Sequence, residues 1–140
     1  MAIDFLECCD SIEECYEFLL GYAAQGLPSD HGSPAGGEVR SQLERARDAL
    51  AKLPESCRRA IDDYGLAPFG KYDAFCSMLE RDVGDSLVAI ELVLAQPAIS
   101  SQLIDNLNAS SHVRALLTDL FLFGDILRSH IKVIVPAEKE

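Results

Sequence analysis

The sequence is poor in positive charge: its 12 Lys and Arg residues stand against 23 Asp and Glu residues, a formal net charge of −11. The first 37 residues contain seven acidic side chains and no Lys or Arg. Nucleic acids and anionic membrane surfaces both bind to basic faces, so this deficit argues against either partner. A protein partner with a basic surface fits the charge instead.

Signatures of catalysis are missing as well. The chain has no Gly-x-Ser-x-Gly elbow, no glycine-rich phosphate loop and no His-Glu-x-x-His motif. Neither His112 nor His130 has the Glu three residues earlier that di-metal helical bundles use. We therefore expect no catalytic residue, no metal and no cofactor, and a catalytic function has no support in the sequence.

Targeting and membrane-spanning segments are also lacking. The first residues have no basic region followed by an apolar run, so we expect no secretory leader. The most apolar stretch, 115–135, is interrupted by charges that are costly in lipid: Asp119, Asp125, Arg128 and Lys132. We expect a cytoplasmic protein without a membrane partner, whose five cysteines are mostly reduced.

Apolar residues recur every three or four positions through most of the chain, which predicts an all-α bundle of about five or six helices in one domain, 1–140. The two longest patterns, from Tyr72 to Pro97 and from Val113 to Pro136, lie in the C-terminal half. We expect these two helices at the core. The other expected helices span 4–25, 38–53, 55–64 and 98–107, with Pro54 separating the middle two.

Two segments are expected outside the helices. Residues 27–37, LPSDHGSPAGG, are rich in glycine, proline and short polar side chains, which predicts a mobile loop that neither packs nor holds a regular helix. Residues 136–140 follow the last apolar pattern and are expected to form a short solvated tail after Pro136.

The stretch 7–18, ECCDSIEECYEF, combines five carboxylates with three cysteines. At about 100° per residue the acids fall within an arc of about 120° and the apolar residues lie opposite. Such an arc is either a solvated face or a docking surface. We interpret it as a docking surface for a basic partner, because five acids lack a single balancing base. Its residues are Glu7, Asp10, Glu13, Glu14 and Glu17.

The cysteines of this stretch do not form a metal or disulfide motif. Cys8 and Cys15 are two helical turns apart, too far for one metal ion or for a disulfide within a straight helix. We expect them to be small buried hydrophobic residues. Cys9 lies at the edge of the apolar face, where exposure would make it the candidate redox thiol.

The two long C-terminal helices also carry apolar residues away from their main stripes. A helix that is apolar on more than one face is central in its fold or buries a second face elsewhere. We therefore predict a homo-oligomer or a partner contact through this surplus surface. The residues concerned are Met78, Val88, Leu92, Phe121, Leu122, Ile126 and Val133.

Taken together, these features favour a non-enzymatic helical protein–protein interaction module, acting as an adaptor, a regulator or an accessory, chaperone-like protein. Its contacts would be the acidic face of the first helix and the surplus apolar surface. The alternative is a ligand- or cofactor-binding helical bundle, in one variant a thiol redox sensor through Cys9.

Overall fold

The computed structural model describes the backbone of residues 2–139 and the side chains of residues 4–131. This part of the chain forms five helices and no strand, which confirms the all-α prediction. The helices are α1 (Ala2–Ala24), α2 (Pro34–Tyr64), α3 (Phe69–Leu94), α4 (Ser101–Ala109) and α5 (Ser111–Lys139).

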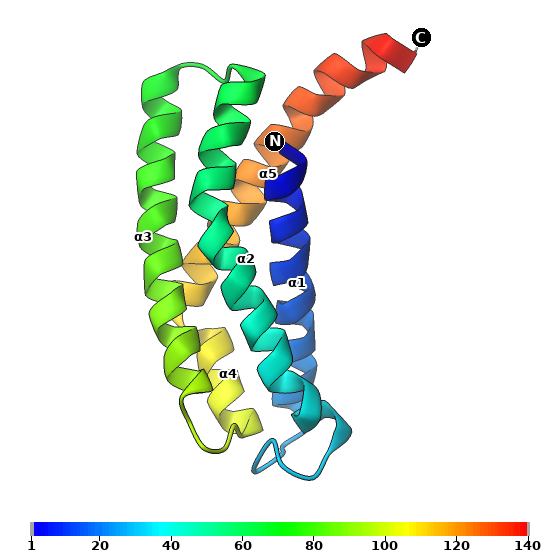
Figure 1. Ribbon diagram of the computed structural model, residues 1–140, viewed down its shortest axis with the longest axis vertical. Coiled ribbons are helices and arrows are strands. Elements are labelled where there is room, and N and C mark those ends of the chain that lie inside the picture. Colours follow the sequence, from blue (N-terminus) through cyan, green and yellow to red (C-terminus); the bar gives the residue numbers. More distant parts are fainter. Residues whose placement is uncertain (1, 140) are drawn as a thin grey trace.

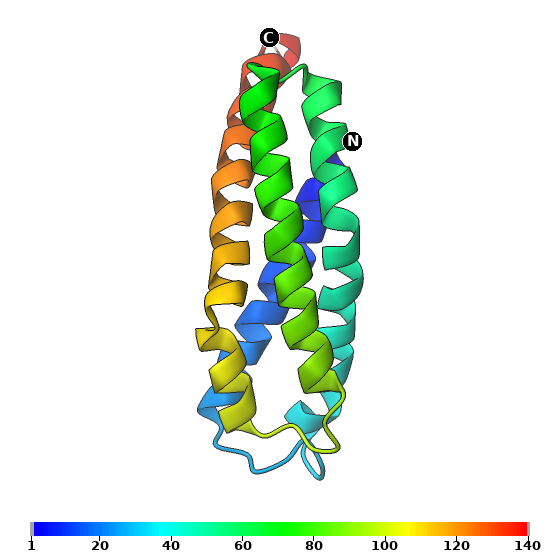
Figure 2. The same cartoon turned by 90° about the vertical axis from the view of Figure 1, so that its left-hand side faces the viewer.

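The helices form an antiparallel bundle of four columns. α1, α2 and α3 alternate in direction, and α4 and α5 follow one another as a broken fourth column (Figures 1 and 2). α1 packs on α2, α2 on α3, α3 on α5, and α1 on α4, so the columns enclose one core. The last turns of α5 extend past the N-terminal end of α1 (Figure 1).

Pro54 and Pro136 were predicted to end helices, but both helices continue through them. α2 continues through Pro54, so the expected helices 38–53 and 55–64 are one, and α5 continues through Pro136 to Lys139, where a tail was expected. A proline removes one backbone hydrogen bond, but the flanking residues can keep helical angles. In α2, Leu53 and Cys57 are fully buried on either side of Pro54, and this packing offsets the proline's penalty. α2 ends, as predicted, at Gly65 with φ 56°.

The core is shared among the columns, and the two long C-terminal-half helices, α3 and α5, both contribute to it as predicted. α2 buries a longer series of residues than α3 does. Aromatic rings join three columns at one end of the bundle: the Phe123 ring lies 5.1 Å from that of Phe5 and 5.2 Å from that of Phe75. Four columns around one axis each bury one stripe, so no helix needs to be central.

Candidate functional site

The loop between α1 and α2 is hydrogen-bonded to the loop between α3 and α4. Asp30 in the first loop is only 8% exposed. Its Oδ1 accepts a hydrogen bond of 2.8 Å from the Ile99 backbone N–H, and its Oδ2 accepts one of 2.8 Å from Arg40 Nε. One buried carboxylate thus joins three segments that are distant in the sequence.

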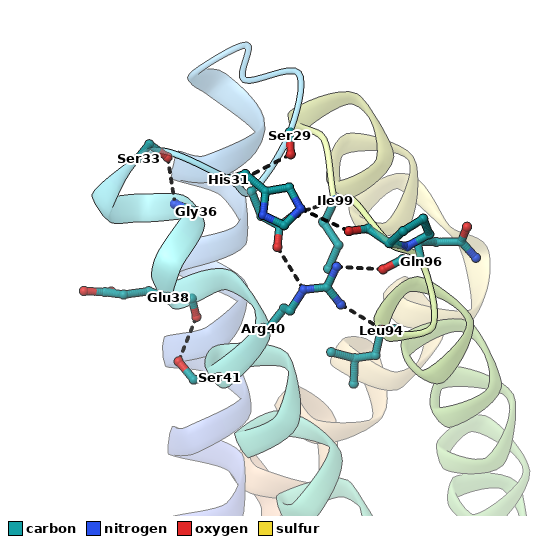
Figure 3. A network of polar contacts seen from close by, with 12 residues as sticks. Ser29, His31, Ser33, Gly36, Glu38, Arg40, Ser41, Leu94, Gln96 and Ile99 are labelled. Atoms are coloured by element: carbon teal, nitrogen blue, oxygen red, sulfur yellow. Dashed lines mark hydrogen bonds and ion pairs between the residues drawn. The ribbon is translucent and has the colours of Figure 1, made fainter.

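Arg40 uses the rest of its guanidinium on the C-terminal end of α3. It donates to the carbonyl oxygens of Leu94 at 2.9 Å and Gln96 at 2.6 Å (Figure 3). Burial alone would raise the pKa of Asp30, but the hydrogen bonds from Ile99 and Arg40 lower it below its ordinary value. Asp30 is therefore ionised and fully engaged in structure.

A second set of bonds reinforces the same junction. The Tyr22 hydroxyl donates to the Ile99 carbonyl oxygen at 2.7 Å, and the Ser101 hydroxyl donates to the Tyr22 carbonyl oxygen at 2.6 Å. The Leu27 N–H donates to Ser101 Oγ at 2.8 Å. These contacts close the end of the bundle between α1 and α4.

The expectation that 27–37 can neither pack nor hold a helix is therefore wrong. α2 begins inside this segment, at Pro34, and the Ser33 hydroxyl caps it by accepting from the Gly36 N–H at 3.0 Å. A Cβ on Gly36 would overlap main-chain atoms of Asp30, so glycine is required there for the close approach. The residue types suggested a loop, but the residues that hydrogen-bond to this segment and hold it in place lie elsewhere in the sequence.

The acidic face of α1 lies on the surface. Glu7, Asp10, Glu14 and Glu17 are exposed, and Glu13 is half-buried. Within the described residues none of these five forms an ion pair. Several acids elsewhere are paired: the guanidinium of Arg58, for example, lies 3.0 Å from Asp73 Oδ1 and 2.8 Å from Glu80 Oε1.

The pKa of Glu13 reflects its burial and the negative charges next to it on this face. Burial raises its pKa, and the negative charges of Asp10 and Glu17 raise it further, against a partial opposing effect of Arg128. Within the described part of the chain, the positive side chains therefore do not balance the negative charge of this acidic stripe.

Glu7 also borders a groove of about 590 Å³ between α1 and α2. The α2 side of the groove carries three cations at seven-residue intervals, Arg45, Lys52 and Arg59. Arg59 lies 3.5 Å from Asp4 across the groove. This basic stripe was not predicted, although its heptad spacing places the three side chains on one face of a helix.

Part of the predicted apolar surface is exposed, and its exposed residues lie on two helices, α3 and α5. Val88 and Leu92, one turn apart on α3, are 70% and 64% exposed, and Phe121 and Leu122 on α5 are 54% and 53% exposed. Met78 and Ile126 are half-buried, and Val133 lies outside the residues whose side chains are described. Phe69, 62% exposed at the start of α3, was missed.

Ile126 belongs to an apolar pocket between α3 and α5 rather than to the open surface. The pocket has a volume of about 250 Å³ and is lined by the rings of Tyr72, Phe75 and Phe123. An apolar side chain of a partner would fit its chemistry.

Cys9 occupies a different position from the one predicted. It is 2% exposed in the core, whereas Cys8 is half-buried and lines the groove between α1 and α2. Burial, and then the charge of Glu13, raises the pKa of Cys9 to about 12. The core-facing stripe of α1 runs through Cys9 instead of Cys8, so Cys9 is buried and the exposure that its redox role would require is not met.

A second buried acid lies between α3 and α5. Asp119 is 4% exposed, and its Oδ2 has no hydrogen-bond donor among the described residues. Burial raises its pKa to about 7, with further contributions from a hydrogen bond with Asp82 and from the charge of Asp82. Folding therefore favours the protonated form of the Asp119 carboxyl group.

Within the described residues, no group of three or more His, Cys, Asp or Glu side chains is arranged to hold a metal ion. In the same part of the chain, no helix combines the length and the apolarity needed to cross a membrane. Comparison with known proteins assigns no family to this arrangement: no family model, no curated protein and no solved structure matches the chain.

Proposed function

We propose that the protein is a non-enzymatic interaction module that binds a basic protein surface through the acidic face of α1. The observation that carries this proposal is the stripe of five carboxylates, four of them exposed, that form no ion pair in the described chain. Cationic side chains of a partner would relieve the repulsion from Asp10 and Glu17, which adds to the effect of burial on the pKa of Glu13. Because such a contact is electrostatic, it should weaken with salt.

The exposed apolar residues of α3 and α5 provide a second contact in this proposal. Exposed large side chains such as Val88, Leu92, Phe121 and Leu122 are usually covered when a protein associates. We assign them to a second copy of the chain. The acidic face would then remain available to the partner in the assembled oligomer.

The first experiment tests the acidic face by reversing Glu13, Glu14 and Glu17 to Lys. Immobilised protein would be offered a basic probe, a 20-residue polylysine, at two salt concentrations, and a cell extract from its source. We expect the reversal to abolish binding of both polylysine and the extract protein that the wild type retains. The helical circular dichroism should be unchanged, because these side chains lie outside the core.

A matched control variant separates position from net charge. Glu44, Glu91 and Asp105 are exposed acids on α2, α3 and α4, and reversing them to Lys changes the net charge equally. This variant should retain the extract protein. If both variants lose it equally, or if neither does, the acidic face of α1 is not the binding site.

The second experiment tests the apolar contact by native mass spectrometry. A multiple of 15.3 kDa is expected for the wild type, and monomers are expected for Val88→Gln/Leu92→Gln or Phe121→Gln/Leu122→Gln. Leu20→Gln is the control, since Leu20 is 47% exposed on α1 and lies outside the assigned surface. A monomeric wild type would contradict the second-copy assignment, and a monomer with added mass would favour the ligand-binding alternative.

A further inference from the structure

Two buried cysteines face each other across the α2–α3 interface. Cys57 Sγ and Cys76 Sγ are 3.5 Å apart, and the two residues are separated by 19 positions in the chain. Cys57 is fully buried and Cys76 is 1% exposed. The two sulfur atoms, 3.5 Å apart, must approach by about 1.5 Å to reach the disulfide bond length of about 2.05 Å.

A surface hollow leads to one of these sulfur-bearing residues. A cavity of about 120 Å³ between α2 and α3 is lined by Cys76 and by Arg58, Asp73 and Phe69, among others. Arg58 is held over it by its bonds to Asp73 at 3.0 Å and to Glu80. A molecule the size of hydrogen peroxide, little larger than water, fits this space.

We propose that Cys57 and Cys76 are a redox-convertible pair that closes to a disulfide when hydrogen peroxide reaches Cys76. In the first step Cys76 sulfur attacks a peroxide oxygen, the O–O bond breaks and one water leaves, which gives a sulfenic acid. In the second step Cys57 sulfur attacks Cys76 sulfur, the S–O bond breaks and a second water leaves. The two thiols lose two electrons and two protons, and the peroxide is reduced to two waters.

The surroundings of the pair set the order of these steps. Burial raises the pKa of both thiols, so the reaction should be slow. At Cys76 the hydrogen bond with Cys57 and the charge of Arg58 lower the pKa in part, whereas at Cys57 the contact with Cys76 raises it. Cys76 is therefore the attacking thiol and Cys57 the resolving one.

The inference is independent of the acidic face and of Cys9. The disulfide would tie α2 to α3 next to the turn that joins them, whereas the acidic face lies on α1. Closing the loop restricts the unfolded chain, so oxidation should raise the melting temperature if the bond forms without strain.

The test is peptide mapping of folded, full-length protein after treatment with excess hydrogen peroxide. Residual thiols are alkylated in denaturant, and the protein is digested with trypsin without reductant. Cys57 lies in the tryptic peptide 53–58 and Cys76 in 72–81, while the other three cysteines share the single peptide 1–40. We expect a cross-linked peptide of 53–58 and 72–81 that disappears on reduction, with a higher melting temperature for the oxidised protein.

Three variants and an unfolded sample serve as controls for the Cys57–Cys76 cross-link. Cys15→Ala removes another buried thiol and should still give the cross-link. In Cys57→Ala, Cys76 should be trapped as a sulfenic acid by dimedone, whereas in Cys76→Ala, Cys57 should not be. The proposal is overturned if both peptides stay fully alkylated in the folded protein, if peptide 1–40 takes either cysteine instead, or if the cross-link forms only in denaturant.

Discussion

Asp30 and Asp119 are both aspartates with almost no exposed surface, yet the protein shifts their pKa values in opposite directions. Asp30, 8% exposed, receives donors from Ile99 and Arg40, and its pKa is lowered. Asp119 is 4% exposed, and burial, followed by the neighbouring carboxyl group of Asp82, raises its pKa to about 7. The donors around the carboxyl group, rather than the degree of burial, decide which protonation state folding favours.

The two sites also differ in what they do for the fold. The ionised Asp30 bridges two loops and so joins the ends of three helices. Asp119 lies within the α3–α5 packing, where its Oδ2 has no donor in the described chain. A buried polar group stabilises a fold only where its partners are complete.

Asp30→Ala should have the largest effect on stability. The change leaves the buried Ile99 N–H and the Arg40 guanidinium without their acceptor, and breaking a buried pair in this way costs about 3 to 5 kcal/mol. Urea unfolding monitored by circular dichroism would measure this loss. Asp105→Ala, at an exposed site on α4, should stay within about 0.5 kcal/mol. A loss as small as that of the control would show that Asp30 does not join the loops.

Asp119→Asn should change the pH dependence of stability. The folded state holds the Asp119 proton more tightly than the unfolded state, so its contribution is complete below about pH 4 and is lost as the pH rises to about 7. We expect the wild type to lose about 1 to 3 kcal/mol over this window and the variant to lose less. Urea unfolding at several pH values would measure both.

The control for this comparison is Asp125→Asn, an exposed acid on the same helix, which should keep the wild-type pH profile. Asp30 has the opposite sign: its lowered pKa contributes stability above about pH 4 that is lost as the pH falls through its folded value. Asp30→Asn should therefore flatten the acid limb only. A pH profile that Asp119→Asn leaves unchanged would contradict the raised pKa of Asp119.

Gly36→Ala should destabilise the protein by about 1 to 3 kcal/mol, because the added methyl group overlaps the Asp30 main chain. Gly37→Ala is a matched control one residue away, where a Cβ meets no atom within 4 Å. Alanine should stabilise that position by up to about 1 kcal/mol. Thermal unfolding of the two variants would measure the expected loss of stability in Gly36→Ala and the expected gain in Gly37→Ala. Equal changes in stability would show that the close approach of Gly36 to Asp30 is not maintained.

Tyr22→Phe should have the smallest effect, a loss of about 1 kcal/mol, since it removes only the hydrogen bond to the Ile99 carbonyl oxygen. Tyr16→Phe on the same helix is the control, because the Tyr16 ring is half-buried and takes no part in this junction. Urea unfolding would compare the two. An equal loss in both would mean that the Tyr22 hydroxyl does not contribute to closing this end of the bundle.

The helices were predictable because their signal is local. Apolar residues three and four apart mark one face of a helix wherever they occur, and the five helices follow this spacing. The acidic residues of α1 reach the surface for the same reason, since the core-facing stripe lies opposite them. Phe5, Ile12 and Leu19 are buried as the helical wheel predicts. Whether Cys8 or Cys9 completes this stripe depends on the neighbouring helices, which a wheel does not include.

The sequence by itself determined the all-α class, the exposed acidic stripe and the helix end at Gly65, because each depends on residues within a few turns. The tertiary structure decided whether Pro54 breaks a helix, whether the 27–37 segment packs, and which thiols and carboxyl groups meet. The Asp30–Ile99 bond spans 69 residues and the Cys57–Cys76 contact spans 19. Burial and partners at such separations arise only when the columns pack, and they set the pKa values and the reactivity of these groups.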